Sequence, residues 1–158
     1  MSIFLKYGSV LGDAEDAGHT NWIDIKAVSW GLARPVTNPA GTTAGRVLSA
    51  PQLSELTLTK DEDVASIPLI QAALEGSPVA AQIDFCMTGV GQQQVYYSIA
   101  MTGAVITAFS QAGSDGRPVE SVTLNFAQIS FIGTQMDADG TAASPSSFGW
   151  DIGTNAST

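Results

Sequence analysis

The stretch VTLNFAQISFIGTQM (residues 122–136) alternates apolar and polar residues as a β-strand does, but the alternation changes parity partway along. Its apolar residues fall first on even and then on odd positions: Val122, Leu124 and Phe126, then Ile129 and Phe131. Successive side chains of a strand point to opposite faces, so the switch turns the apolar set over. Two explanations are open, a β-bulge near Ala127 or burial of the two faces in different places.

The rest of the chain also consists mainly of short strand-like runs. WIDIKAVSWG (22–31) repeats the parity switch, because Ile23 and Ile25 define one face and Val28 and Trp30 the other. The clearest hairpin joins two alternating runs, 79–87 and 95–101, through the turn GVGQQ, and Gly103 marks a further bend. We expect eight or nine strands without βαβ alternation, which favours a mainly β fold of barrel or sandwich type.

One segment has the pattern of an α-helix, SIPLIQAALEG (66–76). Ser66 is the expected N-cap, Pro68 suits the first turn, and Gly76 suits the position after the last turn. A chain of 158 residues predicts one domain over 1–158, and only the terminal NAST (155–158) is expected to be disordered.

Two segments rich in Gly and Pro interrupt the strands. RPVTNPAGTTAG (34–45) and QAGSDGRP (111–118) predict irregular, exposed loops. Long loops in a compact domain are more often functional than idle, so both are candidates for intermolecular contacts.

Charge excludes several classes of partner. The net charge is −9 and no Lys or Arg follows Arg117, which argues against nucleic acid and against an anionic membrane surface. Only 13% of the residues are charged, which predicts that other subunits cover part of the surface. The first residues, MSIFLKYG, lack the features of a cleaved signal peptide, and no apolar run is long enough to span a membrane.

No group of residues predicts catalytic, cofactor or metal chemistry. His19 is the only histidine and has no evident companions, and Cys86, the only cysteine, is expected to be a half-buried thiol. DADG (137–140) lacks the later ligands of a calcium loop, and GVGQQQ (89–94) lacks the third glycine of a dinucleotide motif. The adjacent Asp61, Glu62 and Asp63 leave a hydrolase open as an alternative, although helix capping explains them more simply.

Several motifs together resemble the Hcp family, the tube proteins of bacterial type VI secretion systems. They are IFLKYG with the acidic GDAED and His19, WIDIKAVSWG, LTLTKDED with the Ser-x-Pro helix, PVESVTLNFAQISF and FGWDI. Each is weak alone, but they occur in the family's order over nearly the whole chain.

The resemblance implies a small β-barrel of two packed antiparallel sheets with one short α-helix, a fold that the family shares with phage tail-tube proteins. It implies a homo-hexameric ring and stacked rings inside a contractile sheath, with a spike and effector cargo as partners. The protein would be cytoplasmic during assembly and then secreted without a cleaved signal peptide. No enzymatic activity, cofactor, nucleic acid or membrane insertion is implied. A phage or related tail-tube protein and a monomeric ligand-binding β-barrel are the alternatives.

In this interpretation the loops supply contacts between stacked rings. The parity switch separates the side chains of one strand that belong to the core of the subunit from those that serve assembly. Val122, Leu124 and Phe126 would point into the barrel, whereas the later apolar residues would contact a crossing element or a neighbour. The candidate contact residues are Arg34, Asn38, Arg46, Asp115, Arg117, Ile129 and Phe131.

Overall fold

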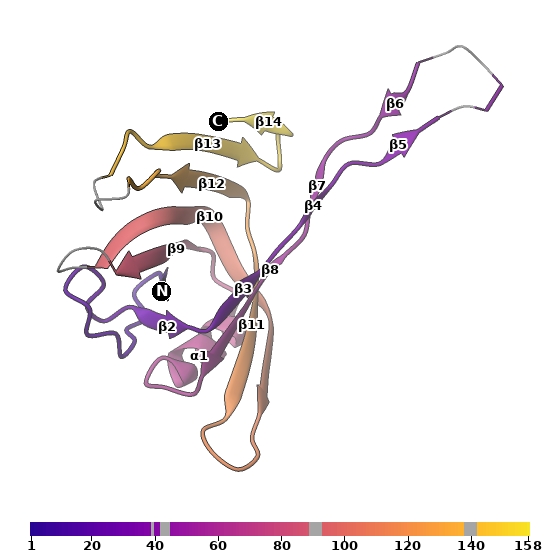
Figure 1. Ribbon diagram of the computed structural model, residues 1–158. Helices are drawn as coiled ribbons and strands as arrows, with labels where there is room; N and C mark the ends of the chain where they lie inside the picture. The colour runs from indigo at the N-terminus through magenta and orange to yellow at the C-terminus, as the bar shows by residue number, and fades with distance from the viewer. Residues whose placement is uncertain (39, 42–44, 89–92, 138–141) are drawn as a thin grey trace.

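The computed structural model describes residues 1–38, 40–41, 45–88, 93–137 and 142–158, in which it has fourteen strands and one helix (Figure 1). Two antiparallel sheets form the body. Sheet A has the order β2 (Ile23–Ile25), β1 (Ser2–Tyr7), β9 (Val79–Thr88), β10 (Gln93–Ala112), β12 (Gln128–Gly133), β13 (Ser146–Asp151) and β14 (Ala156–Ser157). Sheet B has the order β10, β11 (Val119–Asn125), β8 (Leu56–Asp61) and β3 (Ala27–Ser29).

Each parity switch marks a place where the chain leaves one sheet for the other. β11 in sheet B ends at Asn125 and β12 in sheet A begins at Gln128, so the stretch 122–136 is two strands joined by a corner. The segment 22–31 divides likewise at Lys26 into β2 and β3. Phe126 and Ile129 are both buried in the same core, so the switch keeps the apolar side inward while the chain turns.

β10 makes the same change without ending. Its first half pairs with β9 and β12 and its second half with β11, with a register shift between Met101 and Ala104. Gly103 lies at this bend with φ 65°, a left-handed conformation that favours glycine. The Ala127 N–H donates to the Thr102 carbonyl, so the corners of β10 and of the β11–β12 connection lie against each other. The sequence prediction of a bend at Gly103 is confirmed.

The interior between the sheets is apolar and the two sheets share it. Its fully buried side chains come from both: Leu5, Ile23, Ile83 and Ile99 of sheet A, and Leu56, Leu58, Val122 and Leu124 of sheet B. The barrel expected from the sequence therefore takes the form of two packed sheets joined at shared corners.

The helix α1 (Ser66–Glu75) follows β8 in the chain, contacts β10 and covers the core with Leu69. Gly76 ends it in the left-handed conformation, as predicted, and the Gly76 N–H donates to the Ala72 carbonyl. The prediction that Ser66 is the N-cap is wrong, because Ala65 occupies that position. The Ser66 hydroxyl instead faces inward and donates to Glu120.

The first Gly/Pro-rich segment is part of a long hairpin. We call residues 31–54 the arm; in it β4 (Leu32–Ala33) pairs with β7 (Gln52–Leu53), and β5 (Val36–Thr37) pairs with β6 (Val47–Leu48). Figure 1 shows the arm extending away from the body. Val36 and Thr37 of the predicted irregular loop (34–45) therefore belong to an ordered ladder, and the other strands of the arm lie outside that predicted loop.

Other predictions of irregular structure were only partly correct. The C-terminal NAST is not disordered, because β14 pairs with Trp150 and Asp151, and the Thr158 N–H donates to Gly149. β10 extends to Ala112, which shortens the second predicted loop to residues 113–118. Most of the predicted GVGQQ turn (89–92) and of DADG (138–140) lies outside the described residues.

Candidate functional site

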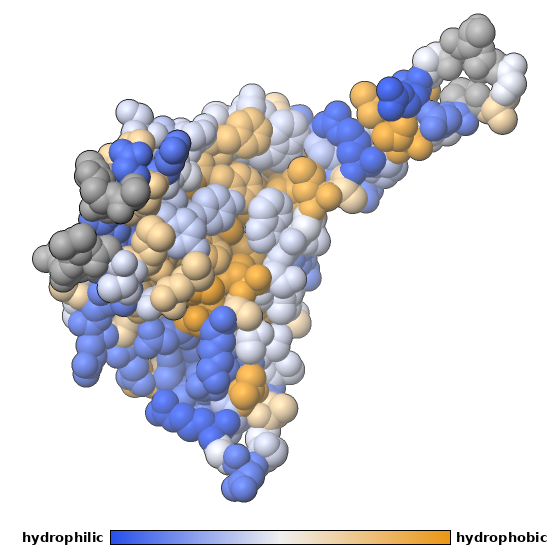
Figure 2. All heavy atoms as spheres, in the orientation of Figure 1, coloured by the Kyte–Doolittle hydropathy of each residue, from blue (hydrophilic) through white to orange (hydrophobic). Residues whose placement is uncertain are grey.

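The arm exposes both apolar and cationic side chains. Leu32, Val36, Val47 and Leu48 are largely exposed, and so are the predicted contact residues Arg34, Asn38 and Arg46. Among the described residues, no carboxylate lies within ion-pair distance of either arm guanidinium. Figure 2 shows hydrophobic atoms between hydrophilic ones along the arm. Uncovered apolar surface of this kind is typical of a contact site.

A second apolar surface lies where the arm joins the body. This aromatic groove has a volume of about 170 Å³ and is lined by Trp30, Leu32, Arg34, Pro51, Leu53, Phe131, Phe148 and Trp150. The Phe131 ring stacks on Trp30 with centroids 5.0 Å apart, and Phe148 is 55% exposed at the rim. The groove thus brings together two predicted contact residues, Arg34 and Phe131.

The sequence reasoning missed the part of the groove contributed by β13. FGWDI entered the sequence analysis only as a motif of the family, yet its two aromatic residues are spaced two apart and so lie on one face of the strand. Phe148 and Trp150 stack with centroids 6.3 Å apart. Two aromatic residues on one face of a strand that is otherwise polar could have indicated an apolar contact surface from the sequence alone.

Ile129 does not belong to this surface. Its side chain is 1% exposed and packs in the interior core, so the prediction that it contacts a neighbour is wrong. The reason is the corner at Phe126 and Ala127. Before the corner the side chains at even-numbered positions of β11 point into the core, and after it the side chain of Ile129, at an odd-numbered position, points into the same core. Phe131 is only half-buried and contributes to the aromatic groove.

The predicted contact residues Asp115 and Arg117 lie in the exposed connection between β10 and β11. Arg117 also lines a cleft of about 200 Å³, together with Asp13, Asp24, Ile25, Lys26, Asp61, Glu62 and Asp63. Burial, assisted by the charges of Asp63 and Asp13, raises the pKa of Asp24. Arg117 therefore already faces acidic groups of its own subunit, which distinguishes it from the arm cations.

His19 holds the segment 9–22 against the outer face of sheet A. The ring lies with Nδ1 2.8 Å from Asp16 Oδ2 and with Nε2 3.0 Å from Asp84 Oδ2. It stacks on Phe4 at 4.6 Å between centroids and meets the edge of Trp22. The single histidine, which sequence reasoning left without companions, is thus a buried link between a loop and a strand.

Cys86 lies beside this link, with Sγ 3.9 Å from His19 Nε2. It is fully buried, and not half-buried as predicted, because segment 9–22 covers it. Burial, assisted by the carboxylates of Asp84 and Asp16, raises the pKa of the thiol to about 11. The thiol is therefore protonated near neutral pH and lacks the thiolate that a nucleophilic cysteine requires.

A second buried ionic group, missed at the sequence level, ties α1 to sheet B. Lys60 is fully buried, with Nζ 2.8 Å from Glu120 Oε2 and 2.7 Å from Asp63 Oδ1. Asp63 also accepts from the Ala65 N–H at 2.9 Å, and Asp61 pairs with Lys26 at 2.6 Å. Two carboxylates of the acidic run considered for hydrolysis thus have structural partners.

The described residues contain no group of three or more His, Cys, Asp or Glu side chains that could hold a metal ion. The helix of the described part of the chain is not long and apolar enough to cross a membrane.

Comparison with known proteins identifies the family. The family model of the type VI secretion system effector Hcp matches residues 4–132. The protein hcp1 of Pseudomonas aeruginosa is 31% identical over 159 residues, which cover 98% of this chain and 97% of that protein.

Solved structures agree on the fold. A type six secretion system protein superposes with a TM-score of 0.91 at 23% identity, covering 99% of both chains. Hcp1 from Salmonella typhimurium superposes with a TM-score of 0.79 at 21% identity, covering 99% of this chain and 98% of that one. The chain therefore belongs to the Hcp family, the tube-forming proteins of type VI secretion systems.

Proposed function

We propose that this chain forms homo-hexameric rings that stack into a hollow tube, and that its arm makes contacts between stacked rings. The residues assigned to these contacts are Arg34, Asn38 and Arg46 of the arm, with Asp115 and Arg117 of the β10–β11 connection. The rings would form in the cytoplasm, and the tube would then leave the cell. A contractile sheath, a spike and effector cargo complete the proposal and rest on the family.

The exposed surface of the arm carries this proposal. Four apolar side chains on a narrow projection gain nothing from the subunit's own core, and their exposure favours association. Head-to-tail contacts between different surfaces close into rings or extend into open stacks, according to the rotation between subunits. A tube requires both kinds of contact.

We assign the lateral contact within a ring to the aromatic groove. Phe131 forms its floor, the exposed Phe148 forms its rim, and aromatic residues are enriched at protein interfaces. Ile129 takes no part in this contact, because it is buried within its own subunit.

The proposed role is mechanical and not catalytic. Support comes from the protonated thiol of Cys86 and from the structural partners of Asp61 and Asp63. We also treat residues 1–158 as one domain, because strands from the beginning and the end of the chain belong to the same sheet.

Native mass spectrometry with negative-stain imaging tests the function. The expected result is a species of six times the 16.3 kDa chain mass and six-fold rings with a central hole. A monomer at all accessible concentrations would contradict the proposal and favour the ligand-binding alternative. The Phe148→Ser variant should keep its fold, because Phe148 is largely exposed, but should give fewer hexamers than wild type.

A further inference from the structure

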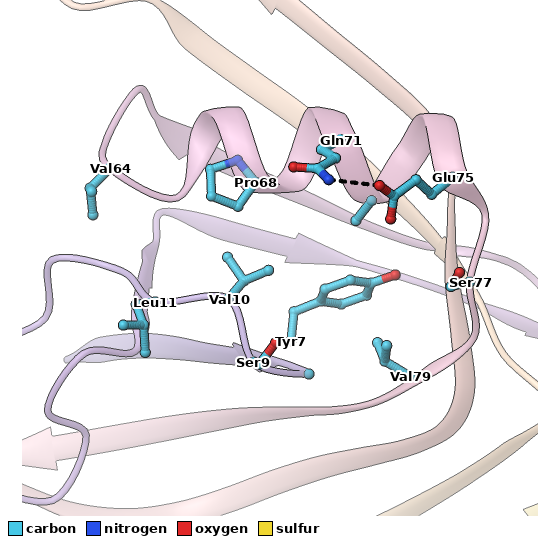
Figure 3. A pocket seen from close by; sticks show the side chains of 12 residues that line it. Tyr7, Ser9, Val10, Leu11, Val64, Pro68, Gln71, Glu75, Ser77 and Val79 are labelled. Atoms are coloured by element: carbon cyan, nitrogen blue, oxygen red, sulfur yellow. Dashed lines mark hydrogen bonds between the residues drawn. The ribbon is translucent and has the colours of Figure 1, made fainter.

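An open groove runs along α1, on the side that faces the segment following β1. It has a volume of about 450 Å³, and Figure 3 shows side chains from both elements pointing toward it. Its lining is mainly apolar: Tyr7, Gly8, Val10, Leu11, Val64, Pro68, Ala72 and Val79, with Ser9, Gln71, Glu75 and Ser77 as polar members. We call it the helix groove. It contains a carboxylate and no Lys or Arg.

The helix adds exposed apolar side chains beside this groove. Ile67 is 73% exposed and Leu74 is 84% exposed, and their spacing of seven residues places them on one side of α1. Leu11 and Val64, which line the groove, are also more than half exposed. An isolated subunit therefore leaves one side of its helix without an apolar partner.

The arm has the complementary surface. It carries two of the six basic residues of the chain and none of the fifteen acidic ones, whereas the whole chain has a net charge of −9. Its exposed apolar residues Val36, Val47 and Leu48 lie on the narrow two-stranded ladder of β5 and β6. A slender, apolar and cationic element suits an apolar groove that contains a carboxylate.

The arm of the same subunit extends away from α1, so it does not fill its own groove (Figure 1). We propose that the helix groove receives the arm of a second copy of this chain, with an arm guanidinium facing Glu75. This rests on the proposed function and names the surface that the arm contacts. The contact is head-to-tail, because arm and groove are different surfaces. Each docked copy still has a free arm or a free groove, so the same contact can be repeated from copy to copy.

Disulfide trapping between two differently marked copies tests the docking. One variant carries Leu48→Cys on the arm, the other Leu74→Cys beside the groove; both side chains are largely exposed, so neither change should unfold the chain. The native Cys86 is buried and protonated, which keeps it out of the reaction. When the two variants are mixed and oxidised, they should give a cross-linked heterodimer in roughly tenfold higher yield than a control pair. Docking of the arm in the groove raises the effective concentration of one thiol near the other.

The control pair combines Leu48→Cys with Glu15→Cys, an exposed position on the 9–22 segment outside the groove. Equal yields from the two pairs would overturn the docking proposal. Oxidation also traps transient contacts, so the measurement does not depend on stable tubes. If wild-type rings stack on the grid but the yields are equal, only the acceptor surface is wrong. If no rings form at all, the proposed function fails.

Charge reversal tests the pairing with Glu75. Adding Glu75→Lys to the groove variant should lower the cross-linking yield a few-fold, as expected for an exposed ion pair. Adding Arg34→Glu and Arg46→Glu to the arm variant should restore it. A yield that falls further in the doubly reversed pair would overturn the assignment of Glu75 as the partner of the arm.

Discussion

In the body of the molecule the ammonium group of Lys60 is fully enclosed between Glu120 and Asp63, whereas Arg34 and Arg46 on the arm lie in solvent. The apolar side chains show the same contrast. Those of the body meet in one core, and those of the arm, such as Val47 and Leu48, have no interior to enter. The interior of the body is thus complete within the single subunit, whereas the arm has no interior of its own and keeps its apolar and cationic side chains uncovered.

Substitutions in the two regions should therefore affect different properties, the free energy of unfolding in the body and association at the exposed positions of the arm. In the body, removing one partner of a buried pair leaves a desolvated charge, so the fold is affected first. At exposed arm positions such as Arg34 and Arg46, a substitution removes no buried contact of the single subunit, so association is affected first.

Lys60→Met should be the most damaging of these changes. It leaves the fully buried Glu120 without its cation, and breaking a buried ion pair in this way typically costs about 3–5 kcal/mol. Urea unfolding followed by tryptophan fluorescence measures the loss. The double variant Lys60→Met, Glu120→Gln should recover part of it, because the stranded charge is gone. If the double variant recovers no stability, the loss in Lys60→Met comes from altered packing and not from the unpaired charge of Glu120.

Two apolar residues of β12 give the next comparison. Ile129→Ala should cost about 2–5 kcal/mol, as expected for a buried aliphatic side chain. Phe131→Ser should cost less, because Phe131 is half-buried, but it should reduce the hexamer fraction in native mass spectrometry more than Ile129→Ala does. An unfolded Phe131→Ser product would return this residue to the ordinary core and remove it from the proposed lateral contact.

These two residues also show how far the sequence could predict the structure. The alternation of apolar and polar residues identified the strands, and the parity switch at Ala127 marked the position of the corner. Both could be found from the sequence because they depend only on neighbouring residues. The two explanations open at the sequence level were a bulge and burial of the two faces in different places. The structure has a corner between two strands instead, and that outcome depended on which strand lies alongside. The backbone contact between Ala127 and Thr102 joins segments far apart in the chain, and no local pattern contains it.

The candidate site was predictable to a similar extent. Gly and Pro marked residues 34–45 as an exposed segment, but the paired base of the arm depends on Gln52 and Leu53, which lie beyond that segment and pair with residues on its other side. The partners of His19 and Lys60 were missed for the same physical reason. Asp84 and Glu120 are far from them in sequence and reach them only through strand pairing.

His19→Ala should have an intermediate effect. It leaves the buried Asp84 carboxylate without one hydrogen-bond donor, at a cost of about 1–3 kcal/mol. Segment 9–22 should then loosen, and Cys86 beneath it should react faster with a thiol reagent in the folded protein. Glu15→Ala, an exposed change in the same segment, is the matched control and should leave labelling slow. Equal labelling of the two variants would show that His19 does not hold the segment.

The buried thiol also predicts a pH dependence. The pKa of Cys86 is raised to about 11 in the folded state, against roughly 8.5 for a free cysteine. Because the folded value lies above the unfolded one, the contribution of this group to stability is fully present below pH ~8.5 and is lost as the pH rises toward 11. Unfolding of wild type and Cys86→Ser across that window should show wild type losing stability more steeply. Parallel curves would mean that the folded thiol ionises as readily as the unfolded one.

The smallest effect on unfolding should come from the arm, through Arg34→Ala with Arg46→Ala. Both side chains are exposed, so the free energy of unfolding of the dispersed subunit should change by no more than about 0.5 kcal/mol. Stacking of rings, followed by imaging and sedimentation, should nevertheless be weakened. Because assembly itself stabilises the folded state by mass action, unfolding must be compared over a dilution series. If the variant also loses stability as a dispersed subunit, the arm cations stabilise the fold of the single subunit. The proposed difference between the body and the arm would then be wrong for Arg34 and Arg46.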